Sequence, residues 1–220
     1  MPIVHENTLR LEILKRFTNN HVFIETGTSG GDGVNVAIAA GFEKIISIEN
    51  DPEAYRIAAE RFRHDSNIRL IYGDSKLALS KLLNLIGEPV TFWLDAHTTD
   101  SCSLLDELEV IAEHDVKTHT ILIDDVRYFR GNYWGITLER ILSTLKRINP
   151  KYIIEYIDGF CKEDILVVTA PVVNDILTKE FNQEIKINAI PHFILISTWK
   201  NSCYRQAKML FKSTLGLDPQ

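Results

Sequence analysis

The feature that most constrains the fold is an alternation of short apolar runs with segments of helical periodicity. The runs are rich in Val, Ile and Phe, and seven of them read as strands: 21–25, 44–49, 68–72, 90–94, 120–123, 152–156 and 165–169. Between strands, apolar residues such as Val34, Ala37 and Ile38 share one helical face. Because right-handed crossovers join parallel strands through helices, this order predicts a Rossmann-like α/β fold. We expect a mostly parallel seven-stranded sheet with helices on both faces.

Local signals mark where helices begin. Asp51 followed by Pro52 places a capping carboxylate before a proline at the first helical position. Ser103 and Asp106 have the spacing of a capping box, and the acidic stretch 106–109 is interpreted as a solvated helix face. Trp93, inside a strand, is expected in the core.

The length of 220 residues, with 45% hydrophobic and 25% charged residues, fits one domain over residues 1–220. The regular alternation covers about residues 20–170. A weaker pattern over 171–220 is interpreted as an appendage with a helix at 172–181, a strand at 193–197, Trp199 in the core and a helix at 201–211.

Net charge and the pattern of cysteines restrict the cellular compartment and the classes of binding partner. A net charge of −6 gives no broad basic field, so nucleic-acid and membrane partners are disfavoured and a small substrate is expected. The three cysteines lack CxxC spacing, which indicates a reducing compartment. The N-terminus has no signal-peptide pattern, and no apolar run approaches the roughly 18 residues that span a bilayer. We therefore expect a cytoplasmic protein, and the sequence leaves self-association into a homo-oligomer open.

A glycine-rich turn follows the first predicted strand, over residues 25–33. Glycines allow a sharp turn and let a ligand approach the main-chain amides at a helix N-terminus. The spacing GxGxxG is not cleanly present, because Gly27 is followed two positions later by Ser29. This favours a ligand in close backbone contact over a bound pyrophosphate. The alternative is a tight turn without a ligand.

Acidic residues end the next two predicted strands. Glu49 lies 24 residues after Glu25, where a doubly wound fold places a carboxylate against a ribose diol. Asp74 follows the third strand and is a candidate acceptor for an adenine amine. The alternatives are a capping carboxylate at Glu49 and a turn residue at Asp74.

The run IETGTSGGDGV, followed by SIEND, GDS, FWLDAH and ILIDDVRYF, resembles class I S-adenosylmethionine-dependent methyltransferases over about residues 20–170. It is more distantly similar to the macrocin-type O-methyltransferases, a group that binds a divalent metal. The resemblance implies that Glu49 holds the ribose, and Asp74 with Ser75 the adenine. It also implies that the methionine portion of the cofactor is held by Glu25 and the turn, with Thr26, Gly27, Thr28, Ser29 and Gly31, and that Asp95 is a further cofactor-binding residue.

An acidic cluster at the ends of the fourth and fifth strands is the candidate metal site. Asp95 ends one strand, and Asp124 and Asp125 end the other. Carboxylate oxygens are ligands for Mg2+, Mn2+ or Ca2+, and the macrocin-type enzymes have acids at corresponding strand ends. We therefore assign the metal role to these three residues. The alternative is a cofactor contact for Asp95 and turn or cap hydrogen bonds for the pair.

His97, two residues after Asp95, is the preferred general base, because a neutral imidazole can remove a proton from a hydroxyl nucleophile. Asp95 is the second choice. Four residues after the aspartate pair are expected in a loop that overhangs the crevice and contacts a sugar or aromatic acceptor: Arg127, Tyr128, Tyr133 and Trp134.

The resulting expectation is methyl transfer from S-adenosylmethionine to a hydroxyl of a small molecule or sugar, with Mg2+ as a second cofactor. Two alternatives stay open. One is a nicotinamide-dependent oxidoreductase, which the missing GxGxxG disfavours, and the other is a non-catalytic binding module of the same fold.

Overall fold

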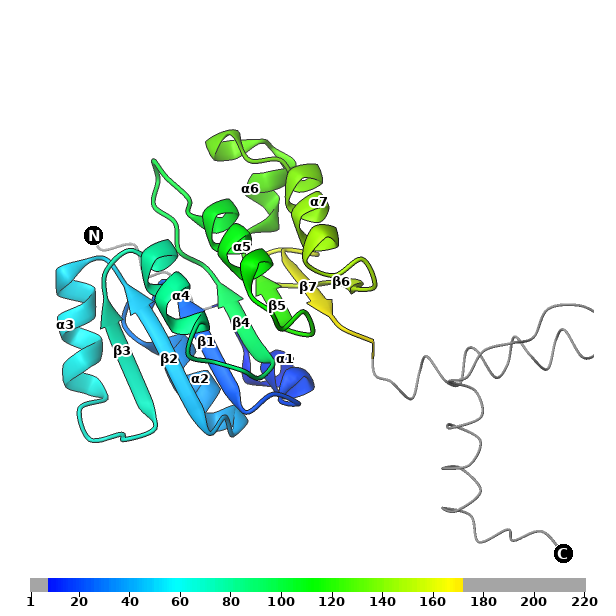
Figure 1. Cartoon of the computed structure of the whole chain (residues 1–220). Helices are drawn as coiled ribbons and strands as arrows, with labels where there is room; N and C mark the ends of the chain where they lie inside the picture. Colours follow the sequence, from blue (N-terminus) through cyan, green and yellow to red (C-terminus); the bar gives the residue numbers. More distant parts are fainter. Residues whose placement is uncertain (1–7, 172–220) are drawn as a thin grey trace, which may run out of the picture. The chain divides into compact units, whose positions relative to one another are not determined.

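The computed structural model describes residues 8–171. The elements expected at 172–181, 193–197 and 201–211, together with Trp199, lie outside the described residues. Within them, seven strands form one sheet in the order β3-β2-β1-β4-β5-β7-β6 (Figure 1). The strands are β1 (Val22–Thr26), β2 (Lys44–Glu49), β3 (Ile68–Tyr72), β4 (Val90–Leu94), β5 (Thr120–Ile123), β6 (Ile153–Ile157) and β7 (Ile165–Thr169). The seven predicted strands are confirmed, with bounds that differ by at most one residue.

The helices are α1 (Leu11–Leu14), which runs into the short 3-10 helix η1 (Lys15–Phe17), then α2 (Asp32–Ala40), α3 (Pro52–Arg61), α4 (Ser75–Leu83), α5 (Leu104–Glu113), α6 (Val126–Arg130), the 3-10 helix η2 (Tyr133–Gly135) and α7 (Leu138–Ile148). In Figure 1, α4, α5 and α7 lie in front of the sheet. Within residues 8–171, no helix is long and apolar enough to cross a membrane.

The pairing of the strands confirms a mostly parallel sheet. β1 pairs in parallel with β2 and β4, β2 with β3, and β4 with β5, whereas β7 is antiparallel to both β5 and β6. Every residue of the two central strands, β1 and β4, is buried. A parallel strand covered on both faces reads as a continuous apolar run, which is why the sequence marks these two strands so clearly.

Two apolar cores lie on opposite faces of the sheet, because successive side chains of a strand point to opposite sides. Phe92 and Leu94 pack with α4, α5 and α7, while Phe23 and Trp93 pack with α1, α2 and α3. Trp93 is 1% exposed, which confirms its expected core position.

Of the two predicted helix caps, one is confirmed. The Asp51 carboxylate accepts the amides of Glu53 and Ala54 at 3.0 and 2.8 Å. Ser103 also stands before its helix, but its side chain caps no backbone amide there, so the capping-box prediction is wrong. Its hydroxyl instead contacts the Ala96 carbonyl and the Glu107 carboxylate.

The interpretation of 106–109 as a solvated face is also wrong in part. Glu107 and Leu108 are buried, at 1% and 0% exposure. The physical reason is the helical period, which places them on one face with Leu104 and Ile111, toward the sheet.

Candidate cofactor and metal site at the carboxyl edge of the sheet

The predicted site residues follow strands whose carboxyl ends meet at one edge of the sheet. Backbone bonds continue the pairing past the strand ends: the Gly27 amide donates to the Ile48 carbonyl at 2.9 Å, and the Asp95 amide donates to Thr26 at 3.1 Å. The Asp124 amide in turn donates to the Leu94 carbonyl at 3.2 Å. In open α/β sheets ligands bind at this edge.

The glycine-rich turn requires glycine at two positions. Gly27 has φ +87°, and a Cβ there would lie 2.6 Å from the Asp95 carbonyl oxygen. Gly31 has φ +84°, and a Cβ there would lie 2.4 Å from the Phe62 ring. These left-handed conformations and close approaches exclude larger side chains. The turn therefore passes tightly over the end of β4 before α2 begins at Asp32.

Glu25 is buried beneath this turn. Its carboxyl group accepts a hydrogen bond from the Ser47 hydroxyl at 2.6 Å, and a Cβ on Gly33 would overlap it. Burial raises the pKa of Glu25 to about 8, although the Ser47 hydrogen bond acts in the opposite direction. Thr28 Oγ1 lies 2.5 Å from Ser47 Oγ and extends the same network into the turn. The contact of Glu25 with a cofactor stays a prediction.

Glu49 joins the end of β2 to the turn. One carboxylate oxygen, Oε2, accepts the Ser29 amide at 2.7 Å, while Oε1 accepts the amides of Asn50 and Asp51 at 2.9 and 2.8 Å. Ser29 itself has φ +48°, an uncommon value for a residue with a side chain. Glu49 thus holds the strained part of the turn in place.

Asp74 and Ser75 both have structural roles, whereas the sequence offered such an alternative only for Asp74, as a turn residue. Asp74 caps α4, where its Oδ1 accepts the Leu77 amide at 2.9 Å. The Ser75 hydroxyl donates to Ser103 Oγ at 3.1 Å, which ties the start of α4 to the start of α5. The cap uses one of the two carboxylate oxygens of Asp74, so the adenine role stays a prediction for the other.

The predicted metal ligands separate into two groups of side chains, each with ligand atoms within 4.8 Å of one another. Asp95, His97 and Asp125 form one group, and Asp124, Asp125 and Asp164 form the other. Asp95 and Asp124 fall in different groups, although the Asp124 charge acts on Asp95, and the Thr8 hydroxyl donates to Asp124 Oδ2.

Burial and the charges of neighbouring carboxylates together raise the pKa values of two aspartates in these groups. Burial, followed by the charges of Asp124 and Asp125, raises the pKa of Asp95 well above its usual range. Burial and the charge of Asp125 raise the pKa of Asp124 to about 7. The Arg127 guanidinium pairs with Asp125 at 2.6 Å and also with Asp164. Arg127 thus pairs with two of the four carboxylates, and oxygen donors of this kind fit a hard divalent cation, which would displace the protons that the raised pKa values favour on Asp95 and Asp124.

His97 lies inside the first group. Its Nε2 is 2.5 Å from Asp125 Oδ2 and 3.5 Å from Asp95 Oδ1. The imidazole also packs against Trp134, with ring centroids 5.0 Å apart.

The segment after β5 carries an aromatic cluster and is joined to the loop after β4. The four residues expected in a loop here lie instead in the short helices α6 and η2. Trp134 Nε1 donates to the Thr98 carbonyl at 3.1 Å, and the Tyr133 hydroxyl donates to Thr99 at 3.3 Å. Tyr128 contacts both of these rings. Arg127 differs from the expectation of an overhanging residue, because its side chain points into the acidic groups.

Sequence reasoning missed three residues of this region: Thr8, Glu107 and Asp164. Thr8 and Asp164 come from distant segments and had no local signal. Glu107 had one, because it falls at helical spacing on the apolar face with Leu104 and Leu108. A lone carboxylate on such a face indicates a buried polar contact.

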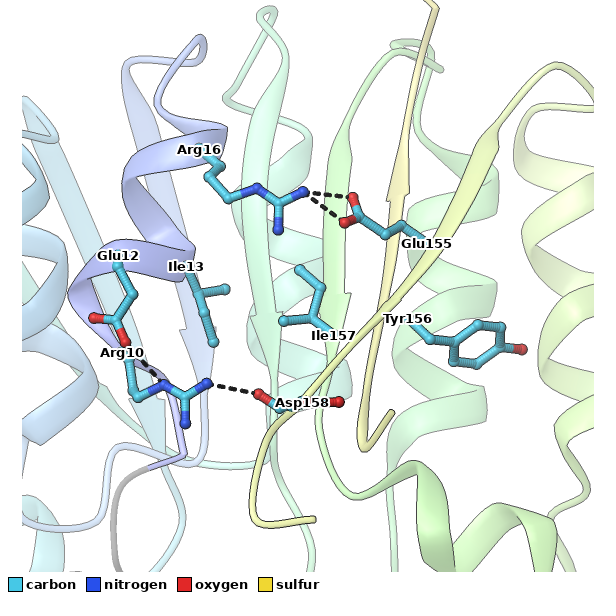
Figure 2. A pocket seen from close by; sticks show the side chains of 8 residues that line it. All are labelled: Arg10, Glu12, Ile13, Arg16, Glu155, Tyr156, Ile157 and Asp158. Atoms are coloured by element: carbon cyan, nitrogen blue, oxygen red, sulfur yellow. Dashed lines mark hydrogen bonds and ion pairs between the residues drawn. The ribbon is translucent and has the colours of Figure 1, made fainter. Parts of the chain in front are cut away.

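A separate open groove of about 420 Å3 lies between α1 and β6 (Figure 2). Arg16 pairs there with Glu155 at 2.6 Å, and Arg10 donates to the Asp158 carbonyl at 2.9 Å. Each arginine is thus already engaged by an oxygen of β6 or of the loop after it. No predicted cofactor or metal residue lines this groove.

No protein-family model and no curated protein matches the sequence. Solved structures do match. An O-methyltransferase from Bacillus cereus in complex with SAH is 17% identical, with 72% of this chain and 78% of that chain covered and a TM-score of 0.53. An SAH-bound methyltransferase from Podospora anserina is 15% identical, with 74% and 76% covered and a TM-score of 0.52.

An rRNA methylase from Streptococcus thermophilus is 10% identical, with 74% of this chain and 94% of that chain covered and a TM-score of 0.52. At these identities the likeness concerns the fold. The described residues have the class I methyltransferase fold, as the sequence predicted.

Proposed function

We propose that this protein transfers a methyl group from S-adenosylmethionine to a hydroxyl of a small molecule or sugar, assisted by a divalent cation. One observation carries the proposal: the glycine-rich turn, Glu49, Asp74 and the group of Asp95, His97 and Asp125 occupy consecutive strand ends at one edge of the sheet. The fold is shared with structures that hold SAH at 15 to 17% identity.

The chain's own atoms suit the cofactor. A carboxylate offers about four lone-pair positions, and Glu49 uses three of them for backbone amides. Its Oε2, which accepts only the Ser29 amide, retains a position for a ribose hydroxyl. The bare backbone at Gly27 supplies a surface for the methionine portion, and the remaining oxygen of Asp74 is available to an adenine amine.

For the divalent cation, Asp95 and Asp125 would supply oxygen ligands and His97 a nitrogen ligand. When bound, such an ion lowers the pKa of an acceptor hydroxyl. Asp124 supports this site from behind, because its Oδ1 accepts the Asp125 amide at 2.8 Å.

The acceptor proton would go to His97 or Asp95, and the acceptor oxygen would attack the sulfonium methyl carbon in line, forming the C–O bond as the C–S bond breaks, with S-adenosylhomocysteine as the leaving group. His97 Nε2 faces both Asp95 and Asp125, so one atom would serve either as ligand or as base. His97 would be a ligand if the site takes up a divalent cation, which would supply Lewis acidity toward the acceptor hydroxyl; with no cation, His97 would be the base and Asp125 would orient its ring.

The acceptor class is inferred from the aromatic cluster and from charge. Tyr133 is 47% exposed beside Trp134, and such rings stack on sugars and aromatic rings. The net charge of −6 opposes a polyanionic acceptor.

The test is calorimetry of the full chain with S-adenosylmethionine, S-adenosylhomocysteine and NAD in separate titrations. We expect both S-adenosyl compounds to bind and NAD not to bind. Binding of NAD alone would replace the proposal with the oxidoreductase alternative, and a titration in which none of the three binds would reject a cofactor site at this edge.

A further inference from the structure

Glu107 is a carboxylate buried among apolar side chains of α5. It is 1% exposed, and its helical neighbours Leu104, Leu108 and Ile111 belong to the core. Burying a carboxyl group in such a place is costly unless hydrogen bonds satisfy it. Its partners therefore indicate what the residue does.

The hydroxyls that bond to Glu107 stand at the carboxyl edge of the sheet. Thr26, the last residue of β1, donates its hydroxyl to Oε2 at 3.2 Å. Ser103, just before α5, donates to Oε1 at 2.9 Å. Ser75, the first residue of α4, donates to Ser103 Oγ at 3.1 Å. One buried carboxylate thus links the end of β1 to the start of α5 and, through Ser103, to the start of α4.

The Ser103 hydroxyl has one proton and two acceptors. Glu107 Oε1 lies at 2.9 Å and the Ala96 carbonyl oxygen at 3.1 Å. An ionised Glu107 draws this proton, whereas a neutral one releases it to Ala96. Because Ala96 stands between Asp95 and His97, the hydroxyl couples Glu107 to the backbone that carries both side chains.

We propose that Glu107 is a positioning residue that fixes the end of β1 and the loop from Asp95 to Ser103 through the hydroxyls of Thr26 and Ser103. The positioning role follows from the hydrogen bonds alone. The inference rests on the proposed function only for the chemical roles of Asp95 and His97. Burial raises the pKa of Glu107 to about 7 against the hydrogen bonds of Ser75, Ser103 and Thr26, with the charge of Asp74 adding to the increase. Among the other charged or titratable groups nearby, Asp95 and Cys102 interact electrostatically with Glu107.

The first experiment needs no ligand. Hydrogen exchange of the full chain is measured in Glu107→Gln and in the control Glu109→Gln. The reporters are the amide of Asp95, which donates to the Thr26 carbonyl, and the amide of Ser103, which donates to the Ala96 carbonyl. Glu109 is on the same helix but pairs with Arg147 at the surface. At pH 8 we expect about tenfold faster exchange in Glu107→Gln, the scale of a lost bond to a charged group, and no change in Glu109→Gln. Unchanged exchange in a folded Glu107→Gln overturns the proposal.

Ser103→Ala provides a second route, and it tests the proposal even if Glu107→Gln does not fold. It removes the coupling hydroxyl, so we expect a similar increase in exchange, and no further increase when it is combined with Glu107→Gln. Increases that multiply in the double variant, or no increase in Ser103→Ala, would show that Glu107 does not act through Ser103.

Calorimetry with S-adenosylhomocysteine at pH 8 then connects the loop to the site. We expect the dissociation constant to rise about tenfold in Glu107→Gln and to stay unchanged in Glu109→Gln. If the parent chain binds no S-adenosylhomocysteine, the proposed function fails, while the exchange experiment still decides the role of Glu107.

Discussion

His119 gives the sharpest prediction for stability, because its hydrogen bonds fix its neutral form. The ring is fully buried, and Nδ1 accepts the Val90 amide at 3.0 Å. The proton of the neutral ring is therefore on Nε2, which donates to His114 Nδ1 at 2.9 Å. His114 Nε2 in turn donates to the Ile86 carbonyl at 2.8 Å. A second proton would have to sit on Nδ1, which already accepts the Val90 amide; a hydrogen bond with the Val116 backbone favours the charged ring, but burial outweighs it.

The sign of the pH dependence follows from the pKa of His119. Burial, with a smaller contribution from His114, lowers this pKa from 6.5 to about 3. Between these values the unfolded chain binds a proton that the folded chain does not, so the free energy of unfolding falls as the pH falls below 6.5. One pH unit corresponds to about 1.4 kcal/mol, so lowering the pH from 6.5 to 5 costs about 2 kcal/mol at this residue.

Urea unfolding followed by circular dichroism at pH 6.5, 6 and 5 measures this cost. His119→Asn keeps an acceptor for the Val90 amide and cannot titrate, so its loss of stability between pH 6.5 and 5 should be about 2 kcal/mol smaller than that of the parent. His21→Asn, at an exposed histidine, should behave like the parent. Equal losses in the parent and in His119→Asn would refute the assignment of a buried neutral imidazole.

Three further predictions concern the cofactor and metal site. Glu49→Ala should weaken S-adenosylmethionine binding in calorimetry by about 1.5 to 3 kcal/mol, the scale of hydrogen bonds to a charged group, while Glu53→Ala on exposed α3 should not. Gly27→Val should abolish cofactor binding and lower the melting temperature, because its Cβ would meet the Asp95 carbonyl at 2.6 Å; Gly30→Ala, with open space around its Cβ, should do neither. Asp125→Asn should weaken Mn2+ binding in calorimetry at least tenfold with unchanged affinity for S-adenosylhomocysteine. Unchanged binding of the respective ligand would remove Glu49, Gly27 or Asp125 from its assigned role.

The sheet could be predicted from the sequence because its signals are local. β1 and β4 are continuous apolar runs, covered on both faces, and the cap at Asp51 depends only on the next three residues. The order of elements then restricts the topology, since parallel strands need crossovers. Because the carboxyl ends of parallel strands meet at one edge of a sheet, the same pattern predicts that Glu49, Asp74 and Asp95 lie there together.

The contacts among site residues could not be predicted, because they depend on segments far apart in sequence. Thr8 and Asp124 are 116 residues apart, and nothing local indicates that they meet. Ser103 failed as a helix cap because its hydroxyl is engaged by Ala96 and Glu107, which only the fold brings to it. A capping pattern states what a side chain can do locally, and tertiary partners compete for the same proton.

Asp125 depends both on its local backbone conformation and on contacts with other segments. It has φ +61°, a left-handed conformation that aspartate tolerates better than most residues with a side chain. In this conformation its two carboxylate oxygens have different partners: Oδ1 pairs with Arg127 at 2.6 Å and Oδ2 with His97 at 2.5 Å. Arg127 stays charged at any working pH, so its ion pair with Oδ1 persists. Under the proposed function, a divalent cation would share the Asp125 carboxylate with both of these partners, so Asp125→Asn would remove a charge that the cation, Arg127 and His97 all use.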